Sequence, residues 1–147
     1  GLLVFGTLPT NNARKTVDRI IDVFPADQQS QVRTMLAASL RGVLAQLLCK
    51  RVDKPGRVAV HEILFATPAV SAIIREGATQ KLYDVITGGK GEGMQFMDES
   101  IWNRLQEGMI SPEEAYMKAI DKTRFKRCLP EKSSHLGDAS GESPLEH

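Results

Sequence analysis

The pattern of hydrophobic and polar positions opens with a continuous apolar run. Residues 2–5 are all apolar, which is typical of a strand buried on both faces. Thr10 or Asn11 can then cap a helix, because short polar side chains accept hydrogen bonds from free helical N–H groups. Apolar residues next recur at spacings of three and four, namely Val17, Ile20, Ile21 and Phe24, before Pro25. We therefore expect a buried strand over residues 2–8 that leads into an amphipathic helix.

A second apolar stripe is longer and predicts a core helix from about residue 27 to residue 49. Its members are Val32, Met35, Leu36, Leu40, Val43, Leu44, Leu47 and Leu48. The stretch KRVDKPGRVAVHEILF, residues 50–65, then predicts two strands around a turn at Lys54-Pro55-Gly56. The residues expected to point inward from these strands are Val58, Val60 and Ile63.

The second half of the chain has helical spacing and clear end signals. Thr67-Pro68 starts a helix that Gly77 can end, and Thr79 can cap the next helix. GGKGEG, residues 88–93, predicts a flexible break. A further stripe ends at Gly108, and the capping box Ser111-Pro112-Glu113-Glu114 opens a last helix to about residue 122. The apolar residues of these helices are Leu82, Val85, Ile86, Met94, Met97, Ile101 and Leu105.

Composition changes this picture little. The 147 residues suit one domain, and a net charge of +1 gives no reason to expect nucleic acid as a partner. No apolar run approaches the length of a membrane span. The two cysteines form no CxxC pair and the three histidines are scattered, so we expect a reducing compartment and no metal site. Residues 133–147 are rich in Ser and Gly and predict a disordered tail that ends in a possible tag remnant, Leu-Glu-His. A strand at residue 1 favours a piece of a longer protein.

Several stretches are candidates for chemistry. DVITGGKG lacks the first Gly and the final Ser or Thr of a phosphate-binding loop, and His61-Glu62 lies on a predicted strand without the spacing of a zinc protease. Residues 118–132 carry six basic residues against two acidic ones, and residues 41–60 carry five against one. These clusters fit either solvated faces or contacts with an acidic partner or nucleotide phosphates. Thr7 and Thr10 lie at the end of the predicted strand, where α/β folds bind ligands, although plain capping is the simpler interpretation.

The chain resembles the type IV pilus retraction ATPases, motors of the secretion ATPase superfamily. The resemblance is carried by residues 1–48, by GRVAVHEILFATPAV (56–70) and by GMQFMDESIWNRLQEGMIS (93–111). It implies an α/β fold, with the C-terminal portion of a RecA-like P-loop ATPase domain over residues 1–66. A helical C-terminal region would follow over residues 67–122, and a basic and disordered tail over residues 123–147.

The resemblance identifies the first ten residues as a degenerate copy of the family's His box, G-H-L-V-F-G-T-L-H-T. This box lies near the nucleotide γ-phosphate in the family. Gly6, Thr7, Leu8 and Thr10 match it, whereas Leu2 and Pro9 stand at the two histidine positions and can neither donate a hydrogen bond nor carry charge. The family's Walker motifs are not found in this chain. We expect ATP and Mg²⁺ to bind the longer protein, and this chain to be inactive, with no ATP affinity tighter than about millimolar.

A second family signature, A-I-R-N-L-I-R-E, belongs to a helix linked to pilus retraction. It corresponds to AVSAIIRE at residues 69–76, where Ala69, Ile74, Arg75 and Glu76 match and Ile73 is conservative. Ser71 and Ala72 replace the first Arg and the Asn. The alternative is that Arg75 and Glu76 are ordinary surface charges, since an Arg near a helix C-terminus is favoured by the helix dipole.

The function implied is that of a hexameric ATPase motor for pilus retraction in twitching motility. Such a motor would act on an inner-membrane platform protein from the cytoplasmic side, peripheral to the bacterial inner membrane. The alternative is a non-catalytic assembly module of a degenerate secretion-ATPase paralogue, which the loss of both box histidines favours. Intact Walker motifs in the longer protein would favour the motor.

Overall fold

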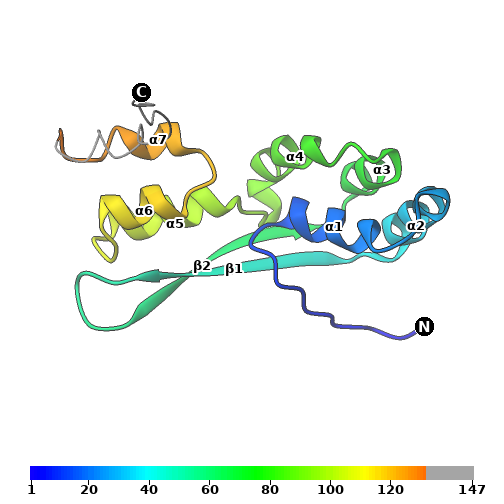
Figure 1. Cartoon of the computed structure of the whole chain (residues 1–147), viewed down its shortest axis with the longest axis horizontal. Helices are drawn as coiled ribbons and strands as arrows, with labels where there is room; N and C mark the ends of the chain where they lie inside the picture. The colour runs from blue at the N-terminus through cyan, green and yellow to red at the C-terminus, as the bar shows by residue number, and fades with distance from the viewer. Residues whose placement is uncertain (132–147) are drawn as a thin grey trace, which may run out of the picture.

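The computed structural model describes residues 1–131, so the tail predicted at 133–147 lies outside the described residues. Within these residues, two α-helices precede a β-hairpin and five follow it (Figure 1). The strands are β1 (Gly42–Lys50) and β2 (Arg57–Phe65). The helices are α1 (Ala13–Asp22), α2 (Ala26–Ser39), α3 (Pro68–Glu76), α4 (Leu82–Gly88), α5 (Met97–Gln106), α6 (Pro112–Lys118) and α7 (Lys122–Lys126), with 3-10 turns η1 (Thr79–Lys81) and η2 (Lys90–Glu92).

The predicted core helix over residues 27–49 is wrong in its second half. Helix α2 ends at Ser39, Leu40 is extended, and residues 42–50 form β1, antiparallel to β2 from the pair Gly42–Phe65 to the pair Lys50–Arg57. Apolar residues at positions 43, 44, 47 and 48 fit a helical stripe and a strand equally, so spacing alone misassigned them. In the strand, Ala45 and Cys49 are buried while Leu44 and Leu48 are exposed, which is the two-residue period of a sheet.

The second strand and its turn are confirmed. The hairpin turn is closed by the N–H of Arg51, which donates to the carbonyl of Gly56, and Gly56 has a φ of 113°, which favours glycine. Val60 is buried and Val58 half-buried, as predicted. Ile63, also predicted to point inward, is the exception. It lies on the other face of β2 from Val58 and Val60, and it pairs across the sheet with the exposed Leu44.

The end signals of the later helices are largely confirmed. The Thr67 side chain accepts from Val70 N, Gly77 closes α3 with a φ of 74°, and the Ser111 hydroxyl accepts from Glu114 N. The last predicted helix stops at Lys118, and a separate short helix, α7, follows. Thr79 does not cap α4 with its side chain; its hydroxyl donates to Asp18 of α1 at 2.8 Å.

The helices lie in two groups along the hairpin (Figure 1), and each group packs around its own hydrophobic core. The first joins α1, α2, α3 and α4 around Leu64 of β2. The second packs α5, α6 and α7 against the part of the hairpin nearer its turn, and Phe125 of α7 is its largest fully buried side chain. Within residues 1–131 no helix combines the length and apolar character needed to cross a membrane.

Candidate functional site

The segment that precedes α1 is extended and open in this structure. Residues 1–8 form no strand, and the side chains of Leu2 and Phe5 are 94% and 89% exposed. The prediction of a buried strand is therefore wrong for the described chain. The physical reason is that an apolar run is buried on both faces only between neighbouring strands, and the two strands within residues 1–131 pair with each other. Gly6, Thr7 and Leu8 of the degenerate box lie on this exposed segment.

Thr10, the last residue of the box, is attached to α1. Its Oγ1 lies 2.6 Å from Oγ1 of Thr16, and the Thr16 hydroxyl donates to the carbonyl of Asn12 at 2.8 Å. The N-cap of α1 is Asn12, whose Oδ1 accepts from Lys15 N at 2.8 Å, so the predicted caps, Thr10 and Asn11, are one or two residues too early. The start of α1 thus fixes Thr10, while residues 1–8 extend away from it (Figure 1).

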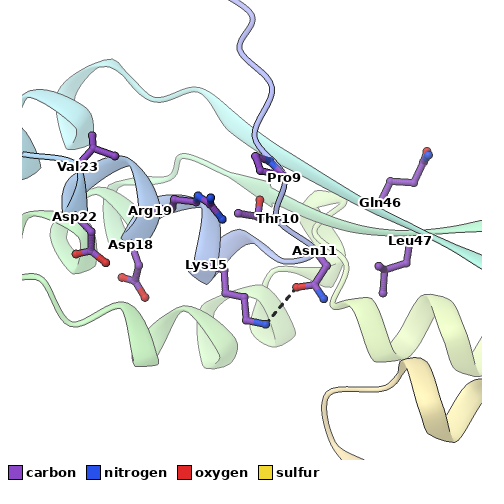
Figure 2. Close-up of a pocket in the computed structure, with 10 residues that line it drawn as sticks. All are labelled: Pro9, Thr10, Asn11, Lys15, Asp18, Arg19, Asp22, Val23, Gln46 and Leu47. Carbon is purple, nitrogen blue, oxygen red and sulfur yellow. Dashed lines mark hydrogen bonds between the residues drawn. The ribbon is translucent and has the colours of Figure 1, made fainter.

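A groove of about 750 Å³ opens beside Thr10 along α1 (Figure 2). Lys15 and Arg19 place two cations on it, and Asp18 and Asp22 place two carboxylates there. Lys15 Nζ lies 3.5 Å from Asn11 Oδ1, the contact drawn as a dashed line in Figure 2. The groove therefore offers polar groups of both signs next to Thr10, which α1 holds in place.

The helix predicted over residues 69–76 is present as part of α3, while its link to retraction stays a prediction. Its residues are of two kinds. Ile73 and Ile74 are buried in the first hydrophobic core, whereas Ala69, Arg75 and Glu76 are exposed. Glu76 lies 4.0 Å from Lys81, an ion pair that contributes little because both side chains are solvated. In the described part of the chain, no hydrogen bond or ion pair joins this helix to Gly6–Thr10, so the two candidate segments do not form one site here.

Glu62 was weighed from the sequence only as part of His61-Glu62, and its role as a buried acceptor of two backbone N–H groups was not predicted. Its carboxylate is buried on the inner face of β2, with Oε1 2.7 Å from Ala13 N and Oε2 3.0 Å from Met97 N. Burial raises the pKa of Glu62, the two N–H donors oppose that rise, and the charge of Asp98 adds to it. The sequence did carry a signal for Glu62. Val60, Glu62 and Leu64 are two residues apart on β2, so all three lie on the face that the hairpin buries.

Asp98 is a second buried carboxylate, one residue beyond Met97. Its two oxygens accept from Ile120 N and Asp121 N, both at 2.8 Å, which ties the link between α6 and α7 to the start of α5. Burial is the main cause that raises the pKa of Asp98, and the two N–H donors again oppose it. Together the two carboxylates hold three separate segments of backbone.

The basic cluster near the C-terminus is partly structural. Arg124 pairs with Glu99 at 2.6 Å, which lowers the pKa of Glu99, and its guanidinium lies 4.6 Å from the ring centre of Trp102. Lys122 Nζ donates to the carbonyls of Tyr116 and Met117 at the end of α6. Within residues 1–131, no group of three or more His, Cys, Asp or Glu side chains is arranged to hold a metal ion.

Comparison with known proteins gives consistent results. No protein-family profile matches the sequence. The chain is 50% identical over 119 residues to a twitching motility protein of Neisseria gonorrhoeae, a match covering 81% of this chain and 32% of that protein. It is 46% identical, over the same share of the chain, to the type IV pilus retraction ATPase PilT of Pseudomonas aeruginosa, of which it covers 34%.

A solved structure agrees in fold. The crystal structure of the pilus retraction motor PilT with bound ADP matches with a TM-score of 0.74 and 34% identity, covering 85% of this chain and 34% of that one. The α/β fold class is thus confirmed as part of the PilT fold. The chain spans about a third of the length of the relatives it matches. Over that third, the chain is similar in sequence and in fold to PilT-like type IV pilus retraction ATPases.

Proposed function

We propose that the chain is part of a hexameric, ATP-driven motor that powers type IV pilus retraction. The observation that carries the proposal is the match to the ADP-bound retraction motor PilT over 85% of this chain. In the longer protein, ATP and Mg²⁺ would bind close to residues 6–10, and the motor would work on the cytoplasmic side of the inner membrane against a platform protein. Arg75 and Glu76, exposed on α3, are then free to take part in contacts that retraction requires.

The division into residues 1–66, 67–122 and 123–147 stays part of this proposal. The first segment would complete a RecA-like ATPase domain, and the helical segment would pass its motion to the base of the pilus. The described part of the chain is compatible with force transfer between the two, because the first core joins α1 and α2 to α3 and α4. The second core likewise joins the hairpin to the last three helices.

The two residues at the histidine positions support a second candidate function. Leu2 and Pro9 have no side-chain group that could contact a phosphate, and Pro9 also lacks a backbone donor. A paralogue with these replacements could use this region for protein contacts alone, as a non-catalytic assembly module. The two functions differ in whether the longer protein turns over ATP.

The deciding experiment measures ATP hydrolysis by the full-length protein that carries this sequence. The motor function predicts measurable turnover, together with a rise on combining Leu2→His and Pro9→His. One transition-state hydrogen bond is worth about 100-fold in rate or more. The matched control is Leu3→His, which adds an imidazole at an exposed neighbouring position outside the box's histidine pattern. No turnover in either protein would support the assembly module, and an equal effect of the control would show that the box positions have no special role.

A further inference from the structure

A continuous chain of hydrogen bonds starts at Thr10. Either hydroxyl can donate in the 2.6 Å contact between the two threonines; we assign the donor role to Thr10, because Thr16 Oγ1 also lies 2.8 Å from the Asn12 carbonyl and has one proton to donate. The same peptide unit that contains the Asn12 carbonyl presents the N–H of Ala13 on its other side. That N–H donates to Oε1 of Glu62 at 2.7 Å. All donors therefore point from Thr10 toward the carboxylate, an arrangement in which each bond strengthens the next.

Glu62 extends this chain into the second core. Its other oxygen, Oε2, accepts from the N–H of Met97, the first residue of α5, at 3.0 Å. The residue at the N-cap of α5 is Phe96, which has no side chain able to cap a helix. One buried carboxylate on β2 thus serves as an acceptor at the N-termini of two helices that are far apart in the sequence, where helix dipoles favour negative charge.

We propose that Glu62 is a positioning residue that couples the Thr10 end of the degenerate box to helix α5. The proposal rests on the proposed function, because the box is relevant to a motor only if it lies near the nucleotide. A group in the groove that accepts a hydrogen bond from the Thr10 hydroxyl would replace Thr16 as its acceptor. The Thr16 hydroxyl could then turn its own proton toward Thr10, which would leave the backbone N–H of Thr16, at 3.1 Å, as the remaining donor to the Asn12 carbonyl. The peptide unit bonded to Glu62 would lose a partner, and the change would reach Met97 through the shared carboxylate.

The coupling is tested without nucleotide, on the 147-residue chain, by amide hydrogen exchange of Ala13 and Met97. Thr10→Val removes the first donor of the chain while keeping the side chain's shape. It should speed exchange of both amides by about threefold relative to the hairpin amide of Val60, because losing the first donor weakens each later bond by a fraction of its strength. In a Glu62→Gln background the amide offers one acceptor in place of two, so Thr10→Val should change Met97 exchange by less than about twofold.

Two controls separate coupling from general loosening. Thr87→Val also removes a helical hydroxyl, one that donates to the Tyr83 carbonyl on α4, and it should leave Met97 unchanged. In the wild-type chain, a pH titration should move the amide signals of Ala13 and Met97 with one shared midpoint. The amides of Ile120 and Asp121 should instead follow Asp98, the ionisable neighbour of Glu62. The titration needs no substitution, so it tests whether both amides depend on Glu62 even if Glu62→Gln does not fold, and Thr10→Val alone then tests whether Thr10 reaches them.

The proposal is overturned if Thr10→Val affects Met97 equally in both backgrounds, or affects Ala13 alone, or if the two amides titrate separately. The full-length protein distinguishes this failure from failure of the proposed function. If the box faces the nucleotide, Thr10→Val and Glu62→Gln should both lower kcat for ATP by about tenfold with KM unchanged. If neither substitution changes kcat while the amide results hold, the coupling stands and the placement of the box near the nucleotide is wrong.

Discussion

Removing the Asp98 carboxylate should detach helix α7 from the rest of the chain. Asp98→Ala leaves the N–H groups of Ile120 and Asp121 without their acceptor, at the link that leads into α7. Each donor left unpaired costs about 1–3 kcal/mol, and since the two N–H groups are partly accessible to water we expect the lower end, about 2–4 kcal/mol in all. Asp98→Asn keeps one acceptor and relieves the burial of a charge, so its cost should be about 1–2 kcal/mol.

Trp102 makes the effect measurable. It is the single tryptophan of the chain, and its ring lies 5.9 Å from that of Phe125 in α7, in an edge-on arrangement. Loss of α7 would expose Trp102, so Asp98→Ala should shift its fluorescence emission to the red before denaturant is added. The urea midpoint should also fall. A typical domain of this size has about 5–15 kcal/mol of stability, so both variants should keep a folded hairpin.

The matched control is Asp121→Ala, in the same link. Asp121 has an exposed carboxylate that caps α7 by accepting from Thr123 N at 3.0 Å, and its backbone N–H still reaches Asp98 in the variant. Loss of this cap should cost about 1 kcal/mol and leave the emission of Trp102 in place. If Asp98→Ala and Asp121→Ala give the same midpoint and the same emission, the buried carboxylate is not what holds α7.

Three further predictions concern the rest of the molecule. Because burial raises the pKa of Glu62, the folded chain holds that proton more tightly than the unfolded chain, and the stabilisation is lost as pH rises through the folded pKa. The free energy of unfolding of wild type relative to Glu62→Gln, measured with urea, should therefore increase as the pH is lowered from about 7 to about 4.5. A decrease on lowering the pH would mean that the N–H donors outweigh burial. The exposed apolar residues 2–5 should make the chain self-associate in light scattering, whereas residues 11–147 should stay monomeric at the same concentration. Calorimetric titration of the 147-residue chain with Mg-ATP should give a Kd no tighter than about millimolar, and a micromolar site with turnover would contradict the expectation.

Local signals in the sequence predicted the helical half of the fold well. Thr67-Pro68, Gly77 and Ser111-Pro112 mark helix ends through caps and fixed φ values, which act within a few residues and need no tertiary context. The hairpin was harder. Residues 43–48 have apolar side chains that suit a helix or a strand, and only pairing with β2 decides between them. The prediction for residues 2–8 failed for the same reason, since an apolar run is buried on both faces only where other strands pair with it.

The same difference between local signals and long-range contacts applies to the candidate site. The box and the α3 motif were found because each is a continuous sequence motif. Glu62 and Asp98 instead accept hydrogen bonds from backbone N–H groups 22 to 49 residues away. The two-residue period of the strand could have located Glu62, since a glutamate between Val60 and Leu64 on a buried face needs hydrogen-bond donors to offset the cost of burying its charge. The strand period could not identify those donors. They are helix N-termini from two different cores, and their position becomes known only when both cores are packed against the hairpin.

This placement explains why a buried charge is compatible with the fold. An isolated carboxylate at this depth would be costly, but each oxygen of Glu62 meets an N–H at the positive end of a helix, so the charge is shared between two dipoles. A neutral side chain could fill the space and leave two N–H groups unpaired. The same reasoning applies to Asp98, whose donors come from a link without helical structure. The hairpin and α5 therefore act as the frame against which α1, next to the box, and α7, at the opposite end, are both positioned.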